Sequence, residues 1–160
     1  MNASFPDEKD LRAAKILIVD DENTGLRCLE LALRKSDFLN YLGLTDSTLA
    51  RESFLKFKPD LVLLDLNMPN LDGFGVLAQI RAEEAAGDFV PVMILTGECT
   101  SDARSRAMAA GASDFLDKPV DYSVLLLRIK NALRTRFLFR QNQELRARLE
   151  SLTGNVEANA

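Results

Sequence analysis

The chain has 160 residues and a formal net charge of −4; 47% of its residues are hydrophobic and 28% are charged. These values fit one globular domain with an additional segment, and the acidic balance argues against a surface dominated by nucleic-acid binding. Histidine is absent, which excludes histidine acid–base catalysis, histidine metal ligands and a phosphohistidine carrier.

The first fourteen residues have neither a basic start nor an apolar core, so they do not form a signal peptide. We expect residues 1–14 to be a flexible segment. No apolar run reaches membrane-spanning length. Cys28 and Cys99 match no metal or disulfide spacing, which is typical of a reducing compartment. These features predict a cytoplasmic protein that binds no membrane.

Five short apolar runs alternate with helical patterns, which predicts a parallel sheet covered on both faces. The predicted strands are 15–19, 40–44, 61–64, 91–95 and 113–116. The first predicted helix follows a cap at Asn23 or Thr24, and the second follows a cap at Asp46 or Ser47 and has Leu49, Phe54 and Phe57 as apolar anchors. The third is predicted over 74–85, with Leu77, Ala78 and Ile80 facing inward and Gly87 ending it. The fourth is predicted over 101–110 with Ser101 as its cap, and the last begins at Asp121. The fold class is α/β, a flavodoxin-like (βα)5 doubly wound sheet of order 2-1-3-4-5 with an extended final helix.

Polar residues follow four of these strands. Asp20 and Asp21 follow the first strand and Asp65 the third, while Thr96 and Lys118 follow the fourth and fifth. Parallel strands end at one edge, so these side chains are expected to converge there. Neighbouring carboxylates repel one another unless a cation joins them, and oxygen ligands favour Mg²⁺. A carboxylate can also attack phosphorus, with the lysine and threonine holding phosphoryl oxygens.

At this point the sequence resembles the receiver domain of two-component response regulators. The resemblance is carried by the Asp20–Asp21 pair, the DLNMPNLDG turn around Asp65, Thr96–Gly97, and FLDKP with Lys118–Pro119. It covers residues 15–134, the expected receiver domain.

The resemblance implies that Asp65 accepts a phosphoryl group from a sensor histidine kinase or a phosphotransfer protein. Asp21 would bind Mg²⁺, with Mn²⁺ as the alternative ion, Asp20 would bind it through water, and the backbone carbonyl of Asn67 would complete the protein ligands. The family does not turn over an external substrate; self-phosphorylation and self-dephosphorylation are its only expected reactions.

Three further features are implied by the resemblance. The peptide bond before Pro119 would be cis. Thr96 and Phe115 would act as the switch. On phosphorylation Thr96 would move toward the phosphoryl group, and the Phe115 ring would rotate inward. These movements would reshape one face of the domain. That face is formed by three elements: the helix that follows the fourth strand, then the fifth strand, and then the final helix. We expect a homodimer through this face, through the final helix, or through both, with Asp114 and Arg128 pairing across subunits.

The final helix is predicted to extend over residues 135–152, because no proline or glycine interrupts it. Coiled-coil spacing relates Leu138, Asn142, Leu145, Leu149 and Leu152, and the asparagine would favour a parallel dimer. Seven basic residues lie between Arg128 and Glu150, and we interpret them as a solvated face rather than a nucleic-acid or membrane site. Residues 153–160 are expected to be disordered.

No output domain is recognisable in the sequence, and the helical extension favours a fragment whose output domain follows in cis. Two other functions stay open. One is an aspartate-nucleophile phosphatase, although Asn67 stands where its second carboxylate is expected. The other is a dimerisation module that is never phosphorylated.

Overall fold

The computed structural model describes residues 6–85, 87–97 and 100–157, with side chains described as far as residue 152. Five parallel strands form one sheet in the order β2-β1-β3-β4-β5, which confirms the predicted topology. The strands are β1 Ile16–Val19, β2 Tyr41–Leu44, β3 Leu61–Leu64, β4 Val92–Thr96 and β5 Asp114–Asp117. Among the described residues, no helix has both the length and the apolar character needed to cross a membrane.

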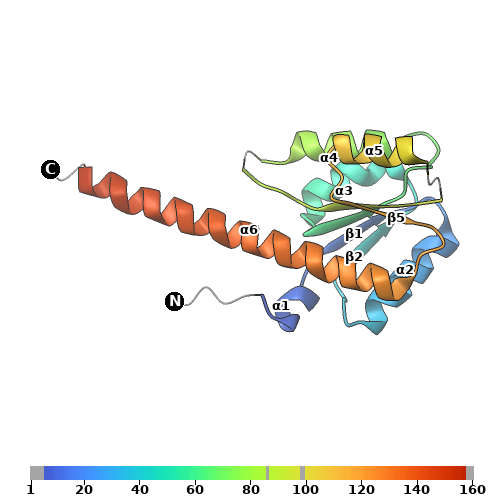
Figure 1. Cartoon of the computed structure of the whole chain (residues 1–160), viewed down its shortest axis with the longest axis horizontal. Coiled ribbons are helices and arrows are strands. Elements are labelled where there is room, and N and C mark those ends of the chain that lie inside the picture. Colours follow the sequence, from blue (N-terminus) through green and yellow to red (C-terminus); the bar gives the residue numbers. More distant parts are fainter. Residues whose placement is uncertain (1–5, 86, 98–99, 158–160) are drawn as a thin grey trace.

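Helices cover both faces of the sheet (Figure 1). The helices are α1 Glu8–Arg12, α2 Asn23–Lys35, the short 3-10 helix η1 Ser47–Leu49, α3 Ala50–Phe57, α4 Gly73–Glu83, α5 Ser101–Ala109 and α6 Tyr122–Glu157. Helices α3, α4 and α5 lie on one face, and α1, α2 and α6 lie on the other (Figure 1). This arrangement explains why the central strands are apolar at consecutive positions rather than at alternate ones.

Alternate residues of one strand enter different cores. Leu17 and Val19 pack with the core beneath α3 and α4, whereas Ile16 and Ile18 pack with that beneath α2 and α6. All four β1 side chains are therefore buried. The central strands hold their carboxyl ends in place because both of their faces are packed.

Some details of the helices differ from the predictions. Leu49 is 47% exposed because it ends η1 before α3 begins, and Ala78 is exposed while Val76 packs inward. Helix α4 ends at Glu83 rather than near Gly87. Its end is set by Glu84, whose carboxylate accepts the Val90 N–H at 2.8 Å and so turns the chain toward β4.

Two caps also lie one residue earlier than predicted. Glu22 precedes α2 without a side-chain capping bond, and Thr100 caps α5 by accepting the Ala103 N–H at 3.1 Å. Asp46 was predicted to cap the helix that is now α3. It instead caps the short helix η1 that precedes α3, where it accepts the Thr48 N–H. These shifts leave the helices on the expected faces of the sheet.

Helix α1 lies within the segment that was expected to be flexible. Asp7 and Asp10 form a reciprocal capping box, and Leu11 is fully buried. Glu8 lies 2.9 Å from the ammonium of Lys130 on α6. A five-residue helix has too few turns to show a hydrophobic period, so its stability comes from this docking. Residues 1–5 lie outside the described residues.

Helix α6 begins where Asp121 accepts the N–H groups of Ser123 and Val124. It continues through Glu157, past the predicted end at residue 152, and projects far beyond the sheet (Figure 1). Residues 158–160 of the predicted disordered tail lie outside the described residues.

Candidate functional site

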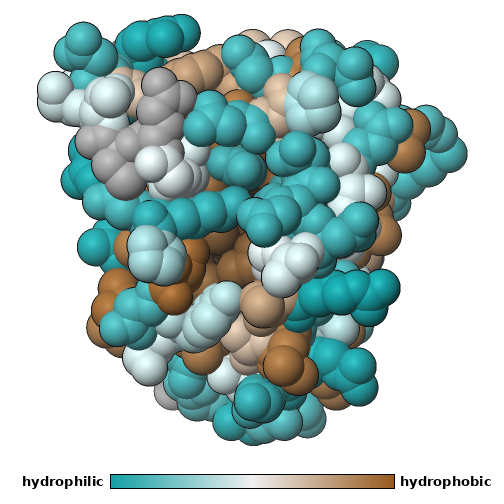
Figure 2. Space-filling model, turned by 90° about the vertical axis from the view of Figure 1, so that its right-hand side faces the viewer, coloured by the Kyte–Doolittle hydropathy of each residue, from teal (hydrophilic) through white to brown (hydrophobic). Residues whose placement is uncertain are grey.

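The candidate site lies at the carboxyl ends of the strands. Asp20 and Asp65 come directly after the adjacent strands β1 and β3, whose last residues are in register. Thr96 ends β4, and Lys118 follows β5. Figure 2 faces this end of the molecule, where hydrophilic side chains lie above a central hollow whose floor is hydrophobic. The parallel sheet thus brings together residues that are far apart in the sequence.

Asp20, Asp21 and Asp65 form an acidic cluster in which one carboxylate oxygen from each lies within 4.8 Å of the others. Asp20 is 2% exposed and Asp65 is 8% exposed, while Asp21 is half-buried. Asp20 Oδ1 accepts the Glu22 N–H at 2.9 Å. The cluster offers only oxygen donors, which is the ligand set that Mg²⁺ requires, so these residues fit the ion implied by the sequence.

Lys118 joins two of these carboxylates. Its ammonium lies 2.8 Å from Asp20 Oδ2 and 3.3 Å from Asp65 Oδ2. Desolvation by burial lowers the pKa of Lys118, but the hydrogen bond and charge of Asp20, followed by those of Asp65, outweigh it and raise the pKa above its usual value. Lys118 is therefore cationic at neutral pH and can hold an anionic group beside Asp65.

The turn after Asp65 depends on glycine at position 73. The Gly73 N–H donates to the Leu66 carbonyl at 2.9 Å, and a Cβ at this position would lie 2.2 Å from the Asp65 carbonyl oxygen. Asp72 caps α4 by accepting the Gly75 N–H at 2.8 Å. The DG pair therefore returns the chain tightly against the strand end and fixes the backbone that carries Asp65.

Thr96 and Phe115 lie on neighbouring strands. Thr96 is fully buried, and its carbonyl accepts the Lys118 N–H at 2.9 Å, which ties β4 to the residue after β5. Phe115 is 6% exposed and packs with the core under α3 and α4. The described residues end at Gly97 and resume at Thr100 on this side of the site.

Arg104 covers the Phe115 ring, a contact that the sequence analysis did not identify. Its guanidinium carbon lies 4.9 Å from the ring centroid, and Nη2 lies 3.1 Å from both Asp117 carboxylate oxygens. The residues belong to α5 and β5, and their spacing of 11 and 13 positions carries no periodic signal. Only the packing of α5 beside β5 creates the contact.

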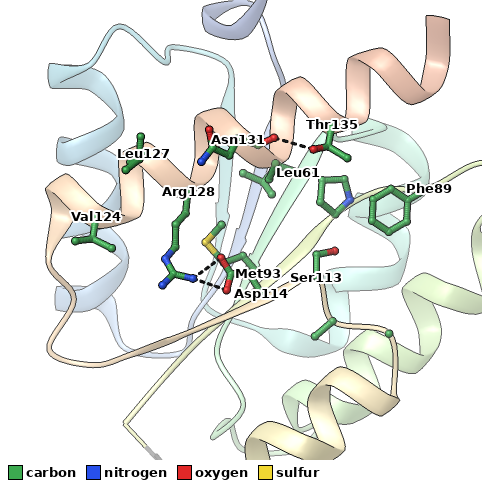
Figure 3. A pocket seen from close by; sticks show the side chains of 14 residues that line it. Leu61, Phe89, Met93, Ser113, Asp114, Val124, Leu127, Arg128, Asn131 and Thr135 are labelled. Carbon is green, nitrogen blue, oxygen red and sulfur yellow. Dashed lines mark hydrogen bonds and ion pairs between the residues drawn. The ribbon is translucent and has the colours of Figure 1, made fainter. Parts of the chain in front are cut away.

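Arg128 and Asp114, expected to pair across subunits, pair within one chain at 2.6 and 2.8 Å. They lie beside a groove of about 840 Å³ between β5 and α6 (Figure 3). Val124 and Leu127 line the groove along α6, and Met93 lies at the β4 side (Figure 3).

The peptide bond between Lys118 and Pro119 is cis.

The basic residues of α6 are not simply a solvated face. Five of the seven have carboxylate partners in other elements; these pairs are Arg128–Asp114, Lys130–Glu8, Arg134–Glu8, Arg136–Asp88 and Arg140–Asp60. The charge run therefore serves mainly to attach α6 to the domain. Leu138, Asn142, Leu145 and Leu149 are exposed on α6.

Residues 16–130 match the model of the response regulator receiver domain. The chain belongs to this family. Its fold and the acidic cluster agree with this membership. Members of the family generally do not turn over a substrate, and they receive signals from histidine kinases.

Similar proteins extend the comparison. The transcriptional regulatory protein PrrA of Mycobacterium tuberculosis is 38% identical over 122 residues, which are 76% of this chain and 51% of that protein. The response regulator PleD of Caulobacter vibrioides is 32% identical over 136 residues, covering 85% of this chain and 29% of that protein. The chain therefore spans about half or less of the length of these curated relatives.

Among solved structures, the BeF3-activated N-terminal receiver domain of Klebsiella pneumoniae RstA is 30% identical, with a TM-score of 0.68. The match covers 75% of this chain and 98% of that chain. The likeness thus includes nearly the whole of a receiver domain and leaves out a quarter of this chain.

Proposed function

We propose that the protein is a phosphorylation-controlled switch in which Asp65 is the phosphoacceptor. The observation that carries this proposal is that Asp65 shares the acidic cluster with Asp20 and Asp21, while its carboxylate lies 3.3 Å from the Lys118 ammonium. An oxygen of Asp65 forms a bond to phosphorus as the P–N bond of the donor's phosphohistidine breaks. The imidazole nitrogen leaves with the bonding electron pair.

Asp20, Asp21, Asp65 and the backbone carbonyl of Asn67 would hold Mg²⁺, or Mn²⁺ in its place. When bound, the ion supplies charge neutralisation for the phosphoryl oxygens. Lys118 would pair with one phosphoryl oxygen, and the Thr96 hydroxyl would donate to another. Positioning and charge are the main requirements for phosphoryl transfer, so these residues supply what the reaction needs.

The switch is proposed to involve Thr96 and Phe115. Thr96 moves toward the phosphoryl group, and Phe115 rotates inward. Phe115 is buried and the Arg104 guanidinium lies over its ring. We propose that this is one of two packings of the α5–β5–α6 face. Phosphorylation then favours one of the two packings, because the phosphoryl group makes better contacts in that packing than in the other. The result is a shift in the populations of the two packings.

The output is proposed to be a change in pairing between two copies of the chain in the cytoplasm. One surface for this pairing is the groove beside Asp114 and Arg128 (Figure 3). The other is the exposed stripe of Leu138, Asn142 and Leu145 on α6, at coiled-coil spacing. Helix α6 would carry the change to an output domain in the longer protein.

The experiment is intact-mass spectrometry after incubation with Mg²⁺ and acetyl phosphate. We expect the mass of one phosphoryl group to be added to the wild type and not to Asp65→Asn, whereas the exposed-site control Asp102→Asn should behave as the wild type. Rapid multiple turnover of phosphomonoesters would instead indicate a phosphatase. A wild-type protein that takes up no phosphoryl group and binds no beryllofluoride would indicate an unphosphorylated dimerisation module.

A further inference from the structure

Helix α6 is held where it leaves the sheet, at the end opposite the acidic cluster (Figure 1). Arg136 is 5% exposed, and its guanidinium donates to the Phe89 carbonyl at 2.5 Å and to both Asp88 carboxylate oxygens, one of them at 3.2 Å. One turn later, Arg140 Nη1 lies 3.2 Å from Asp60 Oδ1. Asp88 and Asp60 lie in the loops that precede β4 and β3.

The Asp60 loop is itself attached to Lys15, the residue before β1. Asp60 Oδ2 accepts the Lys15 N–H at 2.9 Å, and the Asp60 N–H donates to the Lys15 carbonyl at 2.7 Å. Asp88 Oδ1 also accepts the Phe89 N–H at 2.8 Å. The Phe89 ring meets Phe139 of α6 edge-on, with centroids 6.1 Å apart. Movement of α6 would therefore have to break contacts with the loops that precede two strands, β3 and β4.

These contacts set the rotation of α6 as well as its direction. Arg136 and Arg140 are four residues apart, so they share one face of the helix. Leu138, Leu145 and Leu149 lie about half a turn around the helix from that face. Their exposed fractions are 38%, 46% and 62%. Holding the arginine face against the sheet therefore turns the leucine stripe away from the receiver domain.

We propose that the Asp88–Arg136 and Asp60–Arg140 pairs form a latch that presents the leucine stripe of α6, in a fixed orientation, to a second copy of the chain. The role of the stripe rests on the proposed function, but the latch is a property of the single chain. Arg136 is the main residue of the latch because a buried guanidinium without its carboxylate is strongly unfavourable. Arg140 is half-exposed and makes the smaller contribution.

Hydrogen exchange of the amides in residues 137–143, measured at protein concentrations low enough to keep the chain monomeric, tests the latch. We expect Arg136→Met to raise their exchange rates about tenfold or more, and Arg140→Met to raise them less. The matched control is Arg146→Met, which changes an exposed arginine of the same helix and should leave these rates unchanged. Unchanged rates in an Arg136→Met, Arg140→Met double variant would overturn the proposal.

A double-mutant cycle tests whether Asp88 and Arg136 act as a pair. Asp88→Ala and Arg136→Met should each increase exchange, while the double variant should show less than the product of the two effects, because the two side chains act as one pair. Fully multiplicative effects would contradict the latch. Phosphoryl uptake at Asp65 is measured in the same variants and should stay as in the wild type, so failure of the latch is distinguishable from failure of the phosphoacceptor proposal.

The stripe is tested separately by sedimentation of the phosphorylated or beryllofluoride-treated protein. Leu145→Lys should weaken self-association about tenfold or more without changing amide exchange at the latch, since it changes only the outer face of α6. Arg136→Met should weaken it too, although it leaves the stripe residues in place. Self-association that is unaffected by both changes would show that the latch does not present the stripe to a second copy.

Discussion

Lys118 Nζ lies 2.8 Å from Asp20 Oδ2, so the lysine after the fifth strand is paired with the carboxylate after the first. The pair is formed across the carboxyl edge of the sheet, where β3 and β4 lie between β1 and β5. It reduces the repulsion within the acidic cluster, but one lysine balances only one of the three negative charges of Asp20, Asp21 and Asp65. The remaining charge favours binding of a divalent cation.

Mg²⁺ should therefore stabilise the folded chain. At a concentration about 100 times its dissociation constant, a ligand of the native state adds about 2.7 kcal/mol to the free energy of unfolding. Thermal unfolding with and without Mg²⁺ measures this effect. Asp21→Asn should remove most of it, whereas the exposed control Asp102→Asn should retain it. Equal Mg²⁺ effects in wild type and Asp21→Asn would show that the ion binds elsewhere.

Lys118→Met should destabilise the metal-free protein by about 1–3 kcal/mol, because it leaves buried carboxylate oxygens without their donor. The variant should also gain more stability from Mg²⁺ than the wild type does, since the ion then meets an uncompensated cluster. Urea unfolding in the presence and absence of Mg²⁺ compares the two gains. A smaller gain in the variant would contradict this electrostatic account.

Gly73→Ala should cost about 1–3 kcal/mol or more of folding free energy, because the added carbon would lie 2.2 Å from the backbone oxygen of Asp65. The matched control is Gly97→Ala, where the new Cβ would meet no described atom within 4 Å. We expect the control to stay within about 0.5 kcal/mol of the wild type. Urea denaturation gives both values, and similar losses in the two variants would rule out the backbone collision as the cause.

Leu11→Ala tests whether α1 is part of the packed domain. Truncating a fully buried leucine costs about 2–5 kcal/mol, so the variant should unfold at distinctly lower temperature and urea concentration. Leu39→Ala, at a site that is 68% exposed, serves as the comparison and should have little effect. A Leu11→Ala protein as stable as its comparison would mean that residues 6–14 do not pack on α6 in solution.

The Asp88–Arg136 pair predicts a specific pH dependence. The hydrogen bond from Arg136 lowers the pKa of Asp88 below its ordinary value, against a smaller opposing effect of desolvation. The contribution of the pair is therefore present above the unfolded pKa of about 3.9 and is lost as the pH falls through the folded pKa. The difference in unfolding free energy between wild type and Asp88→Asn should be constant between about pH 5 and 7 and should shrink below about pH 4. A difference independent of pH would exclude the charge of Asp88 as its source.

The sequence by itself determined the strand order and the place of the acidic cluster. The consecutive apolar residues of 61–64 require packing on both faces, and a parallel sheet brings the residues that follow its strands to one edge. Asp20, Asp65 and Lys118 were therefore predictable neighbours, because each directly follows a strand.

The tertiary structure decided which charged residues meet elsewhere. Glu8 and Lys130 are 122 positions apart, and Arg136 and Asp88 are 48 apart. No periodicity relates such residues, since their contact depends on how helices and loops pack after the sheet has formed. For the same reason the sequence showed a run of basic residues in α6, and only the folded chain showed that five of them attach this helix to the domain.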